Sequence, residues 1–230
     1  MNKIFNYLGD TISNIIESKY ANKTFIVFGD SRVWYDEKTY TNTCKDEWKG
    51  NKCIGFQSYL RNYLNIITVN EGISAETSIQ ICNRIRNYDF SNCDCILLCG
   101  GVNDTNDTIG NLENIGSSFN TNTVYGAWQS AIEYILSNYP NKKIFIVIPA
   151  IAWRTENDTV FPYERAEVKK NIAELYNLPY CDLYKTLGIN IINRDYYYAD
   201  NVALTNWHLH FNDYGNELIG CVLSSFINNN

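Results

Sequence analysis

The stretch Thr24-Phe25-Ile26-Val27-Phe28-Gly29-Asp30-Ser31 decides the fold of this chain. Its first part is apolar and β-branched, which predicts a short buried strand, and the strand ends abruptly at the Gly-Asp-Ser turn. Similar short apolar runs without clean alternation predict further strands over 66–69, 95–99, 144–148 and 180–183. Such runs are typical of parallel strands that are buried on both faces.

Patterns with helical spacing separate these runs. They predict helices over 4–16, 56–64, 77–85, 128–136, 168–176 and 218–226. Strands that alternate with helices imply right-handed crossovers, a mostly parallel sheet and helices on both of its faces. The chain has 230 residues, 45% of them apolar, and no linker rich in proline or glycine. We therefore expect a single α/β domain over 1–230, with about five parallel strands.

Charge and hydropathy exclude several classes of partner. The 19 basic and 25 acidic side chains give a net charge of −6 and form no basic cluster, which argues against nucleic acid as a partner. The N-terminus carries no apolar run of signal-peptide length, and no later run is long enough to span a bilayer. We expect a protein that is cytoplasmic as synthesised and has no membrane partner.

The eight cysteines show no paired C-x-x-C spacing, and the chain has only two histidines. We therefore expect buried free thiols, no metal site and no cofactor. Cys44 and Cys53 bracket a polar loop, and they could form a disulfide if the protein acts outside a cell.

The chemical candidates follow the ends of the predicted strands. Ser31 comes after the first strand, Gly72 after the second and Asn103 after the third, while His210 precedes the last helix. The carboxyl ends of parallel strands meet at one edge of a sheet, where ligands bind. A serine with a histidine base is a nucleophile, and glycine N–H and asparagine amide donors can form an oxyanion hole.

These residues resemble the four blocks of the SGNH hydrolases, also called the GDSL family. The blocks occur in order as Gly29-Asp30-Ser31, Gly72, Gly101-Val102-Asn103-Asp104 and His210, across almost the whole chain. The resemblance implies a flavodoxin-like three-layer α/β/α sandwich. It also implies that Ser31 is the nucleophile, that His210 is the general base and acid, and that the oxyanion is held by the N–H groups of Ser31 and Gly72 and the Asn103 amide.

The chain departs from the family pattern at two positions. Arg32 stands where the name motif has leucine, and Trp207 stands where the family has an aspartate that orients the histidine. An indole N–H only donates hydrogen bonds, so Trp207 cannot replace a carboxylate. The alternatives are Asp200, if 201–206 is an inserted loop, the side chain of Asn206 or Thr205, a backbone carbonyl, or a dyad with no orienting group.

Members of the family are mostly esterases, lipases, thioesterases and carbohydrate deacetylases. The resemblance therefore predicts a serine esterase that removes a small acyl group, foremost acetyl, from a carbohydrate through an acyl-enzyme intermediate. One alternative is a non-catalytic glycan-binding module derived from such a hydrolase, which Trp207 favours. Another is an intracellular thioesterase or lysophospholipase, which would need a long apolar groove.

Local features lead to further expectations. Val33-Trp34-Tyr35-Asp36 and the segment 53–60 are similar to SGNH modules of bacteriophage tail and baseplate proteins, which implies association with a virion. The tyrosines of 196–198 are candidates for stacking on sugar rings. We expect a loop or surface role for the second histidine, His208, and helix capping by Asp104.

Overall fold

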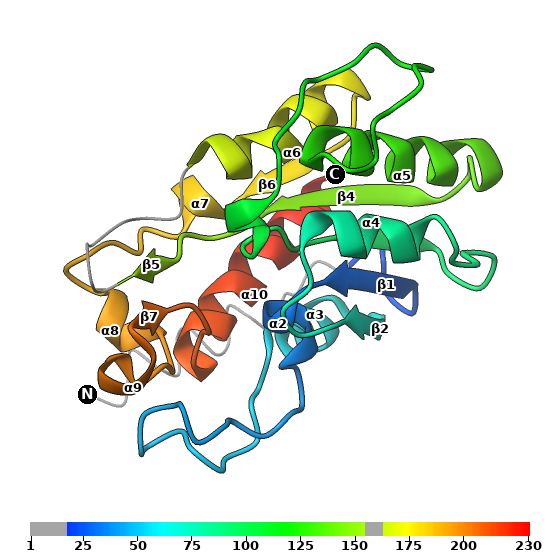
Figure 1. The fold of residues 1–230 in the computed structure, drawn as a ribbon. Helices are drawn as coiled ribbons and strands as arrows, with labels where there is room; N and C mark the ends of the chain where they lie inside the picture. Colours follow the sequence, from blue (N-terminus) through cyan, green and yellow to red (C-terminus); the bar gives the residue numbers. More distant parts are fainter. Residues whose placement is uncertain (1–17, 155–162) are drawn as a thin grey trace.

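The computed structural model describes residues 18–154 and 163–230, so the helix expected over 4–16 lies outside the described residues. Five parallel strands form one sheet in the order β2-β1-β3-β4-β6. They are β1 Thr24–Gly29, β2 Ile67–Gly72, β3 Cys95–Leu98, β4 Lys143–Ile148 and β6 Tyr180–Asp182. Figure 1 shows this sheet between helices, which confirms the predicted three-layer α/β/α fold.

Each face of the sheet has its own apolar core. Phe25 and Val27 of β1 pack with α3 (Phe56–Leu64) and α10 (Asp213–Asn229). Ile26 and Phe28 face the other way, toward α4 (Ser78–Ile85), α5 (Val124–Asn138) and α6 (Tyr163–Leu175). Successive strand side chains point to opposite faces, so a strand covered on both faces must be apolar throughout.

The strand β2 is less buried than its apolar sequence predicts. It is the edge strand of the sheet, and Ile67 and Val69 are 55% and 37% exposed. Its carboxyl end is nevertheless aligned with that of β1, because Gly72 pairs with Gly29. On the other side of β1, Phe28 pairs with Leu98 of β3. The loops that carry the candidate residues therefore start side by side.

Short elements complete the fold. They are α2 Ser31–Trp34, η1 Asp104–Asn106, β5 Trp153–Arg154, α7 Leu183–Thr186, α8 Arg194–Tyr197, α9 Val202–Thr205 and β7 Trp207–His208. The last of these pairs in antiparallel fashion with β5. None of the helices in the described ranges is long and apolar enough to cross a bilayer.

Candidate active site

The turn after β1 fixes the position of Ser31. A Cβ atom on Gly29 would lie 2.3 Å from Cγ2 of Val33, so only glycine allows the strand to enter α2 so sharply. Asp30 caps α2, because its Oδ1 accepts a hydrogen bond from the Arg32 N–H at 3.0 Å. Ser31 is the first residue of α2 and is 3% exposed. Its hydroxyl is therefore held rigidly at the carboxyl edge of the sheet.

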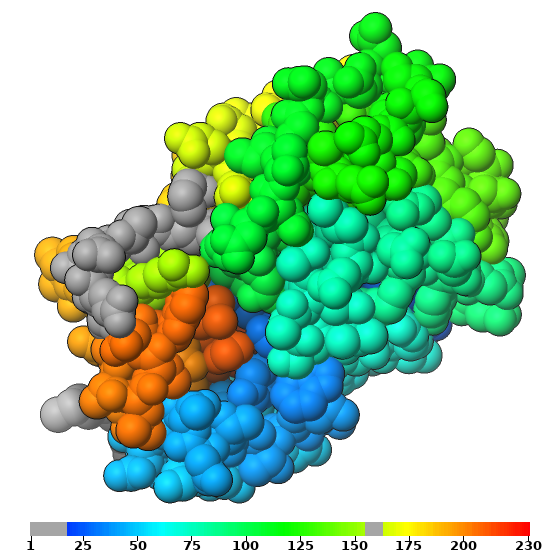
Figure 2. Space-filling view, viewed as in Figure 1, coloured from blue at the N-terminus to red at the C-terminus, as the bar shows by residue number. Residues whose placement is uncertain are grey.

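Three side chains from distant parts of the sequence form a hydrogen-bonded chain at this edge. The Nε2 atom of His210 lies 3.1 Å from Oγ of Ser31. The Nδ1 atom of the same ring lies 2.9 Å from Oδ1 of Asp200. Figure 2 shows the segments after β1 in blue, after β3 in green and before α10 in orange meeting on one face. The fold thus brings a serine, a histidine and a carboxylate together in the order that activates a hydroxyl.

Backbone groups hold both the side chain and the main chain of Asp200. Its Oδ2 accepts the N–H groups of Leu209 and His210, each at 2.6 Å. Asp200 also forms an isolated antiparallel bridge with Cys44 in the long loop after α2. The side chain is almost fully buried. Its two oxygens therefore have fixed and separate partners.

The stretch 201–206 lies between this carboxylate and Trp207 as an inserted turn. It contains α9, which Asn201 caps by accepting from the Ala203 N–H and which ends at Asn206 with a φ of 56°. Of the alternatives that the sequence left open, Asp200 is the group that faces Nδ1 of His210. Thr205 Oγ1 bonds instead within its own turn, to the Asn201 carbonyl at 3.1 Å.

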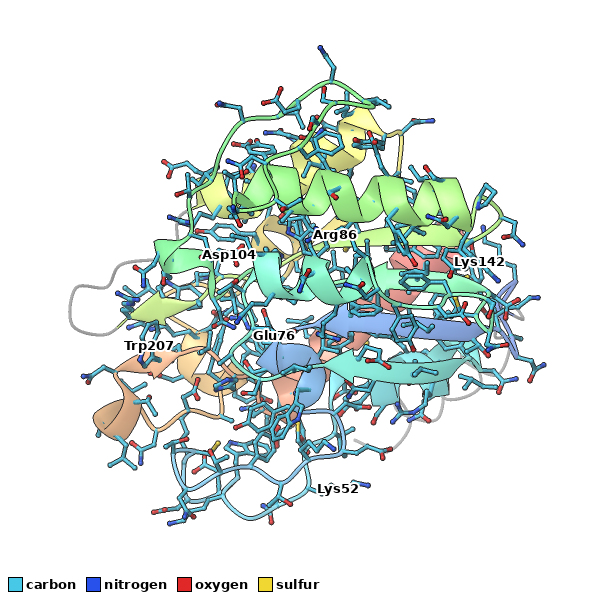
Figure 3. The ribbon with its side chains drawn as sticks, turned by 45° about the vertical axis from the view of Figure 1, so that its right-hand side comes forward. Lys52, Glu76, Arg86, Asp104, Lys142 and Trp207 are labelled. Carbon is cyan, nitrogen blue, oxygen red and sulfur yellow. The ribbon has the colours of Figure 1, made fainter. Side chains whose placement is uncertain are left out.

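Trp207 contributes no group to the hydrogen-bonded chain. Its ring lies under the guanidinium of Arg154, with the Arg154 Cζ atom 4.4 Å from the ring centroid. Figure 3 shows Trp207 toward the carboxyl end of the strands and Lys142 at the opposite end of the sheet.

Arg32, at the motif's leucine position, connects three segments of the site. Its Nε, Nη1 and Nη2 atoms donate to the carbonyls of Leu209, Ala150 and Ile151 at 2.9, 2.5 and 3.0 Å. The guanidinium also stacks on Phe211, 4.8 Å from its centroid. Arg32 follows Ser31 and Leu209 precedes His210, so one side chain joins the backbone next to Ser31 to the backbone next to His210.

Asn103 reaches the site from a turn after β3. Gly100 and Gly101 have φ values of 89° and 110°, a region that favours glycine and lets the chain fold back over the strand end. Asn103 itself has φ −90° and ψ 0°, a sparsely populated conformation that is common at active sites. Its Nδ2 donates to the Glu76 carbonyl at 3.0 Å, so the amide lies against the turn after β2.

The Gly72 N–H has a partner of its own. It donates to Oδ1 of Asn70 at 2.9 Å, so it would have to exchange this bond to bind an oxyanion. Ala75, in the turn that follows, has a φ of 65°, which is unusual for a residue with a side chain. Within the described ranges its N–H has no acceptor. Sequence reasoning passed over Ala75, because alanine gives no signal for such a backbone.

The model of the GDSL-like lipase/acylhydrolase family matches residues 27–218. The chain belongs to this family. Comparison of the sequence with curated proteins gave no match.

Solved structures share the fold of this GDSL-family chain at low identity. A possible lipase from Chitinophaga pinensis is 21% identical, with a TM-score of 0.67, over 89% of this chain and 97% of its own. A lipase/acylhydrolase from Enterococcus faecalis is 17% identical, with a TM-score of 0.58, over 90% and 96% of the two chains. A variant of an acetyl xylan esterase from Geobacillus stearothermophilus is 16% identical, with a TM-score of 0.57, over 90% and 95%. At these sequence identities, the likenesses show a shared fold and no more.

Asp104 of this family member caps a helix, but not the one that it begins. Its Oδ1 and Oδ2 accept the N–H and the hydroxyl of Ser78, the first residue of α4, at 2.7 and 2.6 Å. Burial raises the pKa of the Asp104 carboxyl to about 6. The expected capping role is present, and it connects the turn after β3 to α4. In Figure 3 Asp104 and Glu76 lie at the same end of the sheet.

The loop or surface role expected for His208 is wrong. His208 lies in β7 and is 2% exposed, and its Nε2 is 2.6 Å from Oδ1 of Asp195. Burial lowers the pKa of the imidazole, while its hydrogen bond lowers the pKa of Asp195. The rings of Trp153 and Tyr198 pack against the His208 ring, so His208 belongs to the buried packing next to the segment that carries His210.

Two thiols lie in the loop between α2 and α3. Cys44 and Cys53 are both free and buried in the structure, so no disulfide joins them. Burial raises the pKa of the Cys53 thiol to about 12, which makes it a poor nucleophile. Within the described residues, no group of three or more His, Cys, Asp and Glu side chains is placed to hold a metal ion.

Proposed function

We propose that the chain is a serine esterase that hydrolyses a small acyl ester, foremost acetyl, on a carbohydrate. The observation that carries this proposal is the hydrogen-bonded chain from Asp200 through His210 to Ser31. Membership of an acylhydrolase family supports the same reaction class. The distances of 2.9 and 3.1 Å are those expected for a base that is oriented by a carboxylate and poised on a hydroxyl.

The reaction follows from this geometry. His210 Nε2 takes the proton of Ser31 as Oγ attacks the ester carbonyl carbon. The tetrahedral intermediate collapses when the imidazolium returns this proton to the departing sugar oxygen, which leaves an acyl-serine. Water then attacks the acyl carbon with His210 again as the base, and the released serine recovers its proton. Asp200 holds the ring and stabilises the imidazolium throughout.

The oxyanion needs donors on the side of Ser31 that faces β2 and β3. We place the Ser31 N–H and the second N–H of the Asn103 amide there, together with an N–H from the turn at 72–75. Gly72 can serve if Asn70 releases it, and Ala75 offers an N–H without another acceptor in the described part of the chain. Such donors act most strongly at a site from which water is excluded.

Two cavities lie next to α2. The apolar cavity, lined among others by Arg32, Val33 and Phe211, has a volume of about 30 Å³, which is room for about one water molecule. The larger pocket next to α2 has polar walls. A thioesterase or lysophospholipase needs a long apolar groove, and neither cavity provides one.

The carbohydrate half of the proposal is supported by two likenesses. One structural neighbour is an acetyl xylan esterase, and the local resemblance of residues 33–36 and 53–60 to phage tail modules also points to surface glycans. On the same resemblance we propose that the protein acts as part of a virion.

The decisive experiment removes the nucleophile. We expect Ser31→Ala to abolish hydrolysis of p-nitrophenyl acetate and labelling by a fluorophosphonate probe, with an unchanged circular dichroism spectrum. Ser91→Ala is the matched control, because Ser91 lies in the turn before β3 at the opposite edge of the sheet, where its hydroxyl bonds to Asp89. Full turnover in Ser31→Ala would refute the assignment.

The glycan-binding alternative makes the opposite prediction for the probe. It was motivated by Trp207 in place of the orienting aspartate, and Asp200 now supplies the carboxylate at His210. A binding module without a working base would leave Ser31 unlabelled even in the unmodified protein.

A further inference from the structure

A polar pocket of about 620 Å³ opens next to α2 on the side of the edge strand β2. Its walls are formed by Trp34, Asp36, Glu37, Lys38, Arg61, Thr68, Asn70 and Gly72. We propose that this pocket binds the neutral saccharide that carries the ester. The inference rests on the proposed esterase function and extends it by locating the sugar.

The pocket begins one helical turn from the nucleophile. Ser31 and Trp34 are three residues apart in α2, and residues with this spacing share one face of a helix. Gly72 lies against the same turn, because a Cβ atom on it would be 2.3 Å from the Trp34 N atom. An ester bonded at Ser31 can thus extend its alcohol past Trp34 into the pocket.

The charges of the walls indicate a neutral occupant. The two carboxylates and two basic groups balance, and Arg61 already pairs with Asp36 and Glu37 at 2.9 Å each. Lys38 lies over the Trp34 ring at 5.8 Å from its centroid. A phosphate or carboxylate ligand would have to compete with these ion pairs, whereas hydroxyl groups can join them as donors and acceptors.

The rest of the wall is rigid and suited to a sugar. Asn70 is held at both ends of its amide, donating to the Val33 carbonyl at 3.0 Å and accepting from Gly72. Arg61 is fixed further by a bond to the Thr68 hydroxyl at 2.7 Å. The half-buried Trp34 ring offers the apolar surface on which the C–H face of a pyranose packs. The volume lies within the range of about 300–1,000 Å³ that is usual for small-ligand sites.

Kinetics with two substrates test the proposal. We expect Trp34→Ala to lower kcat/KM for acetylated xylobiose about tenfold more than for p-nitrophenyl acetate, mainly through KM. Only the first substrate carries a sugar that can contact the Trp34 ring. The matched control is Tyr196→Ala, which removes a ring that is 58% exposed on α8, outside the pocket. A loss that is equal for both substrates, or a selective loss in Tyr196→Ala instead, would overturn the proposal.

A binding measurement separates this inference from the esterase proposal. Unacetylated xylobiose is titrated into Ser31→Ala protein, and the Trp34 indole N–H is followed by NMR after assignment with Trp34→Phe. A saturable shift of this resonance supports the pocket, and its absence at millimolar sugar overturns it. If the unmodified protein hydrolyses neither acetyl ester, the esterase proposal fails, while the titration still decides whether the pocket binds sugar.

Discussion

The two oxygens of the Asp200 carboxylate face different kinds of donor. Oδ2 accepts two backbone N–H groups at 2.6 Å, from Leu209 and His210, and only an oxygen can occupy this position. Oδ1 faces Nδ1 of the His210 ring. The backbone therefore fixes the orientation of the carboxylate, and the carboxylate fixes the tautomer in which Nε2 is free to accept a proton.

This geometry predicts the effect of Asp200→Asn. The amide oxygen must take the place of Oδ2, so the NH₂ group faces Nδ1 of His210. Nδ1 then becomes the acceptor and Nε2 carries the proton, which leaves no base for Ser31. We expect kcat for p-nitrophenyl acetate to fall by about 10⁴, the loss known for the equivalent change in serine proteases. A kcat within tenfold of the unmodified protein would show that Asp200 does not set the tautomer.

Sequence reasoning could single out residues that directly follow or precede a regular element. Ser31 and His210 were identified because strand ends and helix starts are readable, and the structure places their side chains 3.1 Å apart. Asp200 stayed one of several alternatives because α9 shifts it from its usual spacing. Ala75 was missed because alanine is not a residue type that predicts a positive φ.

At the scale of elements, Arg32 fixes α2 against two other segments. Its planar fork meets the carbonyls of Leu209, Ala150 and Ile151, which no leucine can do and no ammonium can match in geometry. We expect Arg32→Leu to lower kcat for p-nitrophenyl acetate 10- to 100-fold with little change in KM, since small displacements of a base are that costly. Arg32→Lys should recover part of the loss.

The control for this prediction is Arg86→Leu. Arg86 follows α4, and within the described ranges its guanidinium makes long hydrogen bonds, of 3.4 and 3.5 Å, to Asn83 and Ala127. The Arg86→Leu variant should leave kcat for p-nitrophenyl acetate unchanged. If Arg32→Leu and Arg32→Lys keep full kcat and differ only in melting temperature, Arg32 stabilises the fold without positioning His210.

The regular elements were predictable and the short ones were not. The five strands of the main sheet follow from short apolar runs, and the long helices of the described part follow from apolar residues at helical spacing. Outside the five-stranded sheet, the elements of four residues or fewer, such as α9 and β7, are too short to repeat a period, and tertiary contacts determine them. Most of the residues that orient His210 lie in or beside such short elements.

At the scale of the whole molecule, the two apolar cores and a smaller apolar cluster around Tyr40 also bury most of the thiols. Burial raises the pKa of four of them to about 12, namely Cys53, Cys95, Cys99 and Cys181. A thiolate costs more in these cores than in water, and only unfolding lets the group ionise at its ordinary value of 9. Stability from these groups is fully present below pH 9 and is lost as the pH rises above it.

Lys169 has the opposite effect on the pH dependence of stability. It is buried between the sheet and Trp128, where its Nζ donates to the carbonyls of Leu98 and Val147 at 3.3 and 3.2 Å. Burial lowers its pKa to about 8, so above pH 8 the folded protein releases a proton that the unfolded chain keeps. As the pH rises, Lys169 therefore increases the free energy of unfolding, while the thiols decrease it.

We accordingly expect the free energy of unfolding to fall by about 3 kcal/mol between pH 9 and pH 10, because each of the four thiols lowers it by about 1 kcal/mol over this interval while Lys169 raises it by about 1 kcal/mol. Urea unfolding followed by tryptophan fluorescence, with a reducing agent at pH 8, 9 and 10, measures this. Cys95→Ala combined with Cys181→Ala removes two ionising groups and should reduce the fall to about 1 kcal/mol, because Lys169 still opposes the two thiols that remain. A stability that stays constant up to pH 10, or an equal fall in the double variant, would mean that the buried thiols do not control alkaline unfolding.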